Sequence, residues 1–154
     1  MTIHKVNEHT RAYIKIQDGC NQFCSYCIIP YTRGRIRSKN PEEVIEEVKK
    51  LAAQGYKEIV LTGIHLSSYG KDLGDITLLD VIQRIQQIED IERIRLGSLE
   101  PRIITEQFVK ELRACDKVCP HFHLSLQSGC DEILRRMGRW TNTAQIRTLV
   151  QKLR

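Results

Sequence analysis

Residues 40–62 read NPEEVIEEVKKLAAQGYKEIVLT, which is a helix start followed by a buried strand. Asn40 is a preferred helix-capping residue, Pro41 suits the first helical position, and Glu43 places an acid in the first turn. The following apolar residues recur at helical spacing up to a glycine that ends the helix: Val44, Val48, Leu51 and Gly55. Residues 58–62 are a continuous apolar run, typical of a parallel strand buried on both faces. The stretch predicts an α/β fold.

The same strand–helix unit recurs on both sides of this stretch. Strands are expected at 12–18, about 93–97 and 121–127, and helices around 78–85, from about 105, at 131–137 and at 143–154. Repeated units of this kind favour right-handed crossovers and a parallel sheet. A closed barrel of eight units takes about 250 residues. The 154 residues therefore predict a partial parallel (β/α) barrel with about four strand–helix units.

The composition sets mild limits on partners and location. The chain has 24 Lys and Arg against 19 Asp and Glu, a net charge of +5, which permits an RNA or phosphate partner without requiring one. No apolar run approaches the ~18 residues of a membrane helix, and residues 1–10 lack the apolar core of a signal peptide. We therefore expect a cytoplasmic protein with no membrane partner.

Three of the six cysteines lie within eight residues, directly after the first predicted strand, as Cys20-x3-Cys24-x2-Cys27. In a reducing compartment, clustered cysteines more often bind metal than form disulfides. Iron–sulfur clusters take thiolate ligands, and three thiolates leave one iron of a 4Fe-4S cluster open. The alternatives are a zinc site completed by a histidine, or cysteines without a ligand.

The other candidate residues follow the ends of predicted strands, where the active sites of barrels form. Gly63 follows the second strand, Ser98 and Glu100 the third, and Gln127 the fourth. Each of these has an alternative interpretation as an ordinary turn residue.

Basic residues lie close to the cysteine motif in the sequence. Arg33 and Arg35, in a run that continues to Arg37 and Lys39, are candidates to hold RNA phosphates, and one arginine could contact a carboxylate. A solvated loop explains them equally well. Arg135, Arg136 and Arg139 join the same surface or form the solvent face of a helix.

One cysteine outside the motif and two histidines share one face of the fourth predicted strand: Cys119, His121 and His123. They lack an evident fourth metal ligand. Hydrogen-bonded core groups are the favoured interpretation of the two histidines.

The cysteine spacing, with an aromatic residue (Tyr26) before the third cysteine, resembles the signature of the radical S-adenosylmethionine (SAM) superfamily. The resemblance implies a 4Fe-4S cluster on the three cysteines, whose open iron is chelated by the amino and carboxylate groups of SAM. One electron then cleaves SAM to methionine and a 5′-deoxyadenosyl radical, which removes a hydrogen atom from carbon. The resemblance also implies a SAM pocket, for which the candidates are Tyr26, Gly63, Ser98, Glu100 and Gln127.

Four further segments resemble the methylthiotransferase branch of that superfamily: residues 18–38, 61–70, 95–101 and 121–137. The stretch Gly63–Gly70 is similar to the subgroup that acts on N6-threonylcarbamoyladenosine. The resemblance implies a transferase that adds a methylthio group to carbon 2 of this nucleoside beside the tRNA anticodon. The alternatives are a sister enzyme for isopentenyladenosine tRNA or a ribosomal protein, and a non-enzymatic iron–sulfur or zinc module. Trp140 stands where the family often has tyrosine.

The family resemblance also implies parts beyond this chain. Residues 1–10 are expected to be a linker from a missing amino-terminal domain that carries a second 4Fe-4S cluster, and residues 11–154 an incomplete radical SAM barrel. A carboxyl-terminal RNA-binding domain is also expected. The implied partners are tRNA and an electron donor such as flavodoxin or ferredoxin, and not DNA. The isolated fragment is expected to be unable to complete sulfur insertion.

Overall fold

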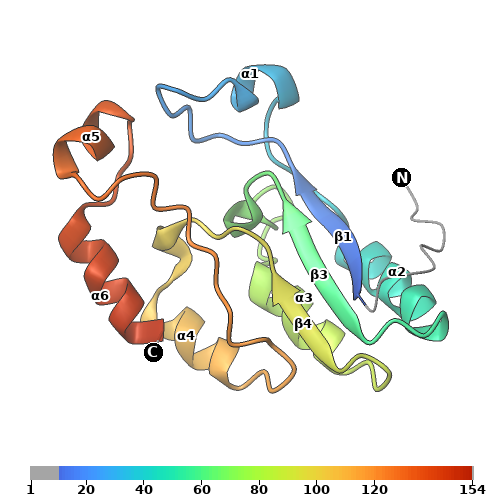
Figure 1. The fold of residues 1–154 in the computed structure, drawn as a ribbon. Helices are drawn as coiled ribbons and strands as arrows, with labels where there is room; N and C mark the ends of the chain where they lie inside the picture. Colours follow the sequence, from blue (N-terminus) through green and yellow to red (C-terminus); the bar gives the residue numbers. More distant parts are fainter. Residues whose placement is uncertain (1–10, 154) are drawn as a thin grey trace.

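The computed structural model describes residues 11–153, which form an open, mostly parallel sheet with helices on one side (Figure 1). The strands are β1 (Arg11–Asp18), β2 (Arg37–Ser38), β3 (Glu58–Gly63) and β4 (Arg93–Leu96), in the order β2-β1-β3-β4. Strands β1, β3 and β4 run parallel, with Ile14 opposite Leu61 and Leu61 opposite Leu96, whereas β2 is antiparallel to β1. The structure confirms the predicted α/β fold.

The helices are α1 (Ile29–Arg33), α2 (Pro41–Ala53), α3 (Leu78–Gln86), α4 (Glu106–Arg113), α5 (Asp131–Arg136) and α6 (Thr143–Leu153), with short 3-10 turns η1 (Leu66–Ser68) and η2 (Pro101–Ile103). Helices α2, α3, α4 and α6 form an outer layer around the sheet, whereas α1 and α5 lie beyond the carboxyl ends of the strands (Figure 1). Helix α2 packs against α3, α3 against α4, and α4 against α6, so these four follow one another around the outside (Figure 1). The arrangement is a half-barrel.

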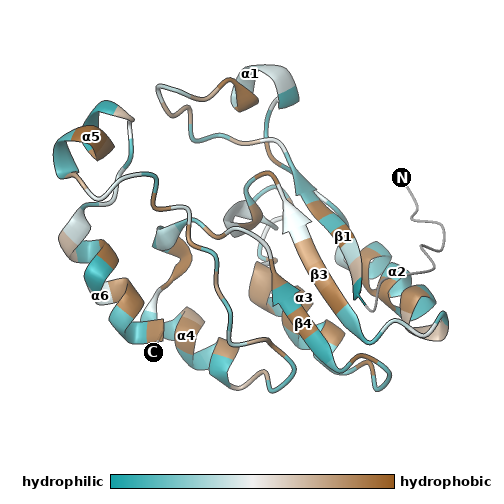
Figure 2. Ribbon diagram, viewed as in Figure 1, coloured by the Kyte–Doolittle hydropathy of each residue, from teal (hydrophilic) through white to brown (hydrophobic). Residues whose placement is uncertain are grey.

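The core lies between the sheet and this helical layer. On β1 the residues alternate, with Ala12, Ile14 and Ile16 buried and Tyr13 and Lys15 exposed on the open face. Figure 2 shows this contrast: β1 is banded, while the middle of β3 is hydrophobic throughout. The continuous apolar run of β3 is therefore confirmed, and so is the predicted period-2 pattern of β1 as far as Ile16. The alternation also predicts Gln17 on the exposed face with Tyr13 and Lys15; this is wrong, because the register shifts between Lys15 and Gln17 and Gln17 is buried.

Side-chain caps fix where the main helices begin. The Asn40 side chain accepts a hydrogen bond from the Glu42 N–H, and the Thr105 hydroxyl accepts one from the Phe108 N–H. Thr77 forms a capping box with Asp80. These caps satisfy N–H groups that have no partner inside the helix. They set α2, α3 and α4 so that the loops before them lie at the carboxyl ends of the strands.

The predicted fourth strand at 121–127 is wrong: no strand forms there. The segment joins the sheet through two isolated parallel bridges, Ile94 with Val118 and Leu99 with Leu124. Pro120 lies between the bridges and has no N–H to donate to a ladder. The N–H groups of His121, Leu126 and Ser128 instead donate to the carbonyl two residues earlier. These local three-residue turns replace a continuous ladder.

The remaining differences are small. Helix α1 and strand β2 were not predicted, and the predicted bounds of the other helices shift by only a few residues. Among residues 11–153 no helix is long and apolar enough to cross a membrane. The predicted linker at 1–10 lies outside the described residues.

Candidate metal centre

The three cysteines lie on an irregular loop that leaves the carboxyl end of β1. Cys20 is buried, whereas Cys24 and Cys27 are partly exposed. The Cys27 N–H donates to the Cys24 carbonyl at 3.0 Å, and the Cys20 N–H donates to the Gly34 carbonyl at 3.1 Å. The loop is therefore closed on itself at both ends by backbone hydrogen bonds.

Within residues 11–153 no three His, Cys, Asp or Glu side chains lie close enough to hold a single metal ion. Cys119, His121 and His123 therefore form no metal site in this part of the chain. Cys119 is buried, but His121 and His123 are exposed, so the interpretation of the two histidines as core groups is wrong. The ligands of an iron–sulfur cluster bind separate irons, so their sulfurs stand further apart. The three thiols of the loop are the donor type that an iron–sulfur cluster takes.

A glycine without space for a side chain starts the loop. Gly19 has φ +70°, and a Cβ there would lie 1.9 Å from the Arg35 carbonyl oxygen. The buried Gln17 side chain donates to the carbonyls of Asp18 and Gly19, both at 2.8 Å. These contacts determine the direction in which the chain reaches Cys20.

We expect Gly19→Ala to lower the free energy of unfolding by about 2–3 kcal/mol, because it adds a backbone clash to a strained φ. Urea unfolding of the two proteins measures the loss. Gly55→Ala is the matched control, since Gly55 has φ +92° but open space around it. Equal losses in the two variants would show that the close approach to Arg35 costs nothing.

A buried arginine lies against the cysteine loop. The Arg139 Nη1 is 3.9 Å from the Cys24 sulfur, and only 8% of its side chain is exposed. Burial raises the pKa of the Cys20 thiol, with Cys24 and Cys27 raising it further and Arg139 opposing the rise. Positive charge favours loss of the Cys20 thiol proton, and Arg139 provides such a charge. The donor set and its cationic neighbour fit a cluster.

An ion-pair network continues from Arg139 to the end of β4. Arg139 Nη2 lies 3.6 Å from a Glu100 oxygen, and Arg102 Nε donates to both oxygens of Glu100 at 3.0 Å. Arg102 also donates to Gln22 on the cysteine loop at 2.6 Å. Arg139 Nε is buried without a hydrogen-bond partner. The interpretation of Arg139 as part of a solvent face of a helix is therefore wrong.

The segment after α5 is also attached to the cysteine loop. Ser25 donates its hydroxyl to the Arg136 carbonyl at 2.7 Å and its N–H to the Met137 carbonyl at 3.1 Å. A Cβ on Gly138 would lie 3.8 Å from the Cys24 Cα. Trp140, two residues on, is exposed. The carboxyl-terminal part of the chain thus closes one side of the loop.

The structure brings some predicted pocket residues together and leaves others apart. Burial, followed by the neighbouring Cys24, raises the pKa of Tyr26, and Glu100 reaches the loop through Arg139. Gly63 packs against Gln17, since a Cβ on it would lie 2.9 Å from the Gln17 side chain.

Ser98 and Gln127 lie further out. The Ser98 hydroxyl pairs with His123 Nδ1 at 2.7 Å. Gln127 is exposed, has φ +71°, and borders a surface hollow of about 460 Å³ with Thr143 and Ile146 of α6.

A larger cleft of about 1000 Å³ opens beside the ion-pair network. Residues from the cysteine loop, η1 and η2 border it: Gln22, His65, Ser67, Glu100 and Arg102. Sequence reasoning missed the roles of Gln17 and Arg139 here. The signal that could have identified Gln17 is its position, as a polar residue near the carboxyl end of β1, just before the cysteine loop.

His65 is held between β1 and η1. Its N–H donates to Gln17 Oε1 at 2.6 Å, and its Nδ1 pairs with the Ser68 hydroxyl at 2.6 Å. Its Nε2 is buried without a partner. Burial lowers the pKa of His65, and the positive charges of Lys71, Arg102 and Arg139 lower it further, while Glu100 opposes them.

This lowered pKa predicts a pH dependence of folding. The unfolded chain takes up the His65 proton near pH 6.5, at a pH where the folded protein still resists it. The stability that the folded protein gains by keeping His65 neutral is therefore complete above about pH 6.5, and it is lost as the pH falls below that value. We expect the free energy of unfolding to drop between pH 7.5 and 5.5, and to drop less in His65→Gln. An identical pH profile in the variant would contradict this.

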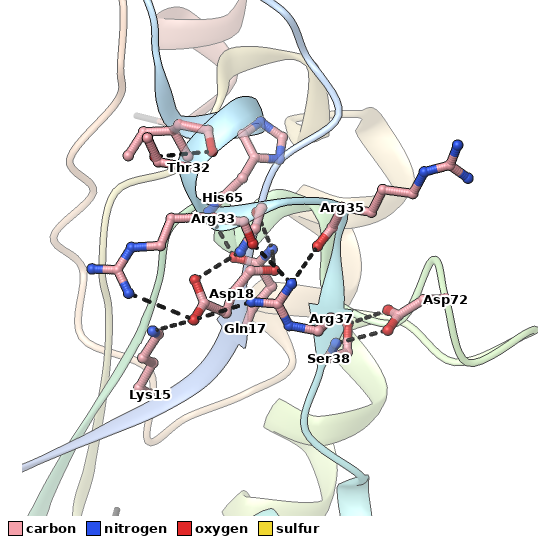
Figure 3. Close-up of polar contacts among 12 residues, drawn as sticks. Lys15, Gln17, Asp18, Thr32, Arg33, Arg35, Arg37, Ser38, His65 and Asp72 are labelled. Atoms are coloured by element: carbon pink, nitrogen blue, oxygen red, sulfur yellow. Dashed lines mark hydrogen bonds and ion pairs between the residues drawn. The ribbon is translucent and has the colours of Figure 1, made fainter.

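The two predicted RNA-binding arginines differ in their surroundings (Figure 3). Arg33 lies 4.0 Å from Asp18, which also pairs with Lys15 at 2.7 Å and Arg37 at 3.6 Å. The hydrogen bond from Lys15 is the largest cause that holds the pKa of Asp18 below its usual value; the Gly19 N–H and the charge of Arg33 lower it further, although burial opposes them. The Arg35 side chain points away from this cluster, with its guanidinium free of partners among the described residues.

Comparison with known proteins gives a consistent result. Residues 14–154 match the Radical SAM superfamily. The chain is 47% identical over 144 residues to a tRNA-2-methylthio-N(6)-dimethylallyladenosine synthase of Dictyoglomus thermophilum, covering 94% of this chain and 33% of that protein. The synthase of the same name from Thermoanaerobacter sp. is 44% identical over 151 residues, covering 97% of this chain and 32% of that protein. The chain thus spans about a third of the length of these relatives.

Solved structures share the fold. The radical S-adenosylmethionine methyltransferase TsrM from Kitasatospora setae superposes with a TM-score of 0.71 at 20% identity, over 92% of this chain and 28% of TsrM. The cobalamin-dependent S-adenosylmethionine radical enzyme OxsB superposes with a TM-score of 0.73 at 13% identity, over 92% of this chain and 22% of OxsB. These likenesses confirm the predicted partial barrel.

Proposed function

Because this chain belongs to the radical SAM superfamily, we propose that it is the cluster-binding part of a tRNA methylthiotransferase. The observation that supports the proposal best is the 47% identity to a tRNA-2-methylthio-N(6)-dimethylallyladenosine synthase over nearly the whole chain, together with three thiols on one loop beside a buried arginine. The relatives are about three times longer, so the complete reaction is proposed for a protein of their length.

We assign Cys20, Cys24 and Cys27 as the ligands of a 4Fe-4S cluster. When bound, the cluster and SAM together supply a reductive cleavage that produces a carbon-centred radical. This chain's own residues bind and orient those groups. Arg139 places positive charge beside the Cys24 sulfur, where it favours an anionic group such as the carboxylate of SAM.

The proposed SAM pocket includes Tyr26, Gly63, Ser98, Glu100 and Gln127. Glu100 acts through Arg139, because two arginines already occupy its carboxylate. Gly63 brings the end of β3 close to Gln17, and so to the start of the cysteine loop.

The proposed RNA substrate carries N6-dimethylallyladenosine, the nucleoside in the names of the relatives. These relatives favour the sister reaction over the predicted N6-threonylcarbamoyladenosine. N6-threonylcarbamoyladenosine remains a second candidate because the stretch Gly63–Gly70 resembles the subgroup that acts on this nucleoside. The two substituents differ in charge, since dimethylallyl is apolar and threonylcarbamoyl carries a carboxylate.

SAM cleavage tests the first half of the proposal. The chain, reconstituted with iron and sulfide without oxygen and reduced with dithionite, is expected to convert SAM to 5′-deoxyadenosine. Flavodoxin or ferredoxin is expected to replace dithionite, and the second cluster is expected outside this chain. A reconstituted protein that holds iron at full occupancy and leaves SAM intact would contradict the proposal.

Nucleoside analysis tests the second half. The protein at its natural length is expressed in a strain that lacks its own tRNA methylthiotransferases, and digested tRNA is analysed by mass spectrometry. We expect 2-methylthio-N6-dimethylallyladenosine to appear. The threonylcarbamoyl product instead would select the second candidate, and the absence of both would overturn the assignment to tRNA.

A further inference from the structure

The cysteine loop and α1 carry a cluster of exposed large apolar side chains. Exposure reaches 58% for Phe23, 65% for Ile28 and 73% for Tyr31, and Tyr26 is half exposed. Figure 1 shows α1 and this loop projecting beyond the carboxyl ends of the strands, away from the core. Large apolar groups gathered on one projection indicate a binding surface.

The two aromatic rings at this projection are held in a defined arrangement. Phe23 and Tyr31 meet edge to face, with ring centroids 5.6 Å apart and an interplanar angle of 82°. Phe23 has φ +47°, a left-handed backbone that bulky residues rarely adopt. Such backbone strain persists only where the surroundings impose it, and it gathers at functional sites. The loop therefore presents Phe23 outward at an energetic cost.

Positive charge follows Tyr31 closely along the chain. Arg33 ends α1, and Arg35 and Arg37 follow it. Arg33 and Arg37 share Asp18 with Lys15, so that one carboxylate faces three cations. Arg35 has no acidic partner among the described residues, and its side chain extends freely (Figure 3). The surface thus combines aromatic rings with uncompensated arginine charge.

We propose that Phe23 and Tyr31 form a stacking platform for unpaired RNA bases, with Arg35 contacting an adjacent phosphate. The inference rests on the proposed function, which places a tRNA loop at the cluster. Proteins that bind single-stranded nucleic acid combine aromatic side chains for stacking with a basic surface for the backbone. Three of the four exposed groups here are aromatic, and the charge beside them is positive. Both features complement bases and phosphates.

Binding of a fluorescein-labelled RNA hairpin with a seven-nucleotide unpaired loop tests the platform. The protein is reconstituted with its cluster, and the iron content of every variant is measured first. Phe23→Leu and Tyr31→Leu keep apolar bulk but lose the ring, so each is expected to weaken binding by about tenfold. Phe23→Tyr and Tyr31→Phe keep the ring and are expected to bind as the parent does. Leucine variants that bind as tightly as the parent would overturn the platform.

The arginine is tested through salt. Arg35→Ala is expected to lower the slope of log K against log salt by about 0.7, the value for one phosphate contact on a single strand. Lys49→Ala, which removes the same charge from an exposed position on α2, is expected to leave the slope unchanged. A fully paired duplex of the same sequence is expected to compete poorly. Duplex and hairpin competing equally would contradict stacking of unpaired bases.

The outcomes separate this inference from the proposed function. If the leucine variants keep RNA affinity while the protein still methylthiolates tRNA, the platform is wrong and the function stands. If the platform binds unpaired RNA but no methylthio nucleoside forms, the proposed function is wrong and the platform stands. If the leucine variants lose affinity only for another part of the polypeptide, the surface is a protein interface and the RNA platform is overturned.

Discussion

Replacing Cys20, Cys24 or Cys27 with alanine is expected to abolish cluster binding, with the iron content of the reconstituted protein falling to background. A 4Fe-4S cluster that has only three protein ligands loses its attachment when one is removed, because thiolates supply the charge that holds the irons. Iron and sulfide analysis, together with the visible absorption of the thiolate–iron bonds, measures the loss. SAM cleavage is expected to disappear with it.

The chain contains its own controls for this experiment. Cys130→Ala removes an exposed thiol before α5, and Cys115→Ala removes a thiol from the core. Both variants are expected to keep full iron content, although Cys115→Ala loses some packing. If a loop variant retained the absorption of the parent while Cys130→Ala lost it, the assignment of the ligands would be wrong.

Glu100→Gln is expected to lower the thermal stability of the protein strongly. Glu100 and Arg139 are both buried, and removal of the carboxylate charge leaves the Arg139 guanidinium without its anionic partner. Breaking a buried ion pair on one side typically costs about 3–5 kcal/mol. For a domain of this size we therefore expect the thermal midpoint to fall by roughly 10 °C. Differential scanning calorimetry of the cluster-free protein measures the change.

An exposed pair provides the comparison for this variant. Glu106 pairs with Lys152 at 2.8 Å, but the Glu106 side chain is 84% exposed. Glu106→Gln makes the same chemical change where water screens the charges, so its midpoint is expected to stay close to that of the parent. A double variant, Glu100→Gln with Arg139→Met, is expected to recover part of the loss, since no buried charge remains unpaired. Equal shifts for Glu100→Gln and Glu106→Gln would show that burial of the pair contributes nothing.

The elements that sequence reasoning predicted well are those determined by neighbours along the chain. The capping residues Asn40 and Thr105 and the alternation on β1 act within one element, so their effect is visible in the sequence. The segment 121–127 alternates in the same way, yet forms no strand. Its alternation describes which side chains face inward, whereas a ladder also needs N–H donors directed at the neighbouring strand; here the N–H groups of Leu126 and Ser128 donate within the segment instead.

The residues of the candidate site also fall into two groups: those found from a local pattern and those that only folding brings together. The cysteine spacing is local and was found directly. Gln17 and His65 are 48 residues apart, and Arg139 and Cys24 are 115 residues apart. Only the folded chain brings these pairs together, and no pattern within either segment indicates its partner. Arg139 in particular looks like an ordinary surface arginine until the loop after α5 returns to the cysteines.

The two hydrogen bonds from Ser25 to the backbone at the end of α5 connect the cysteine loop to that helix. A ligand that orders the loop must also order whatever the loop holds, by thermodynamic linkage. We therefore expect the proposed cluster, by stabilising the loop, to stabilise α5 as well. Amide hydrogen exchange in α5, compared between the reconstituted and the cluster-free protein, measures this coupling.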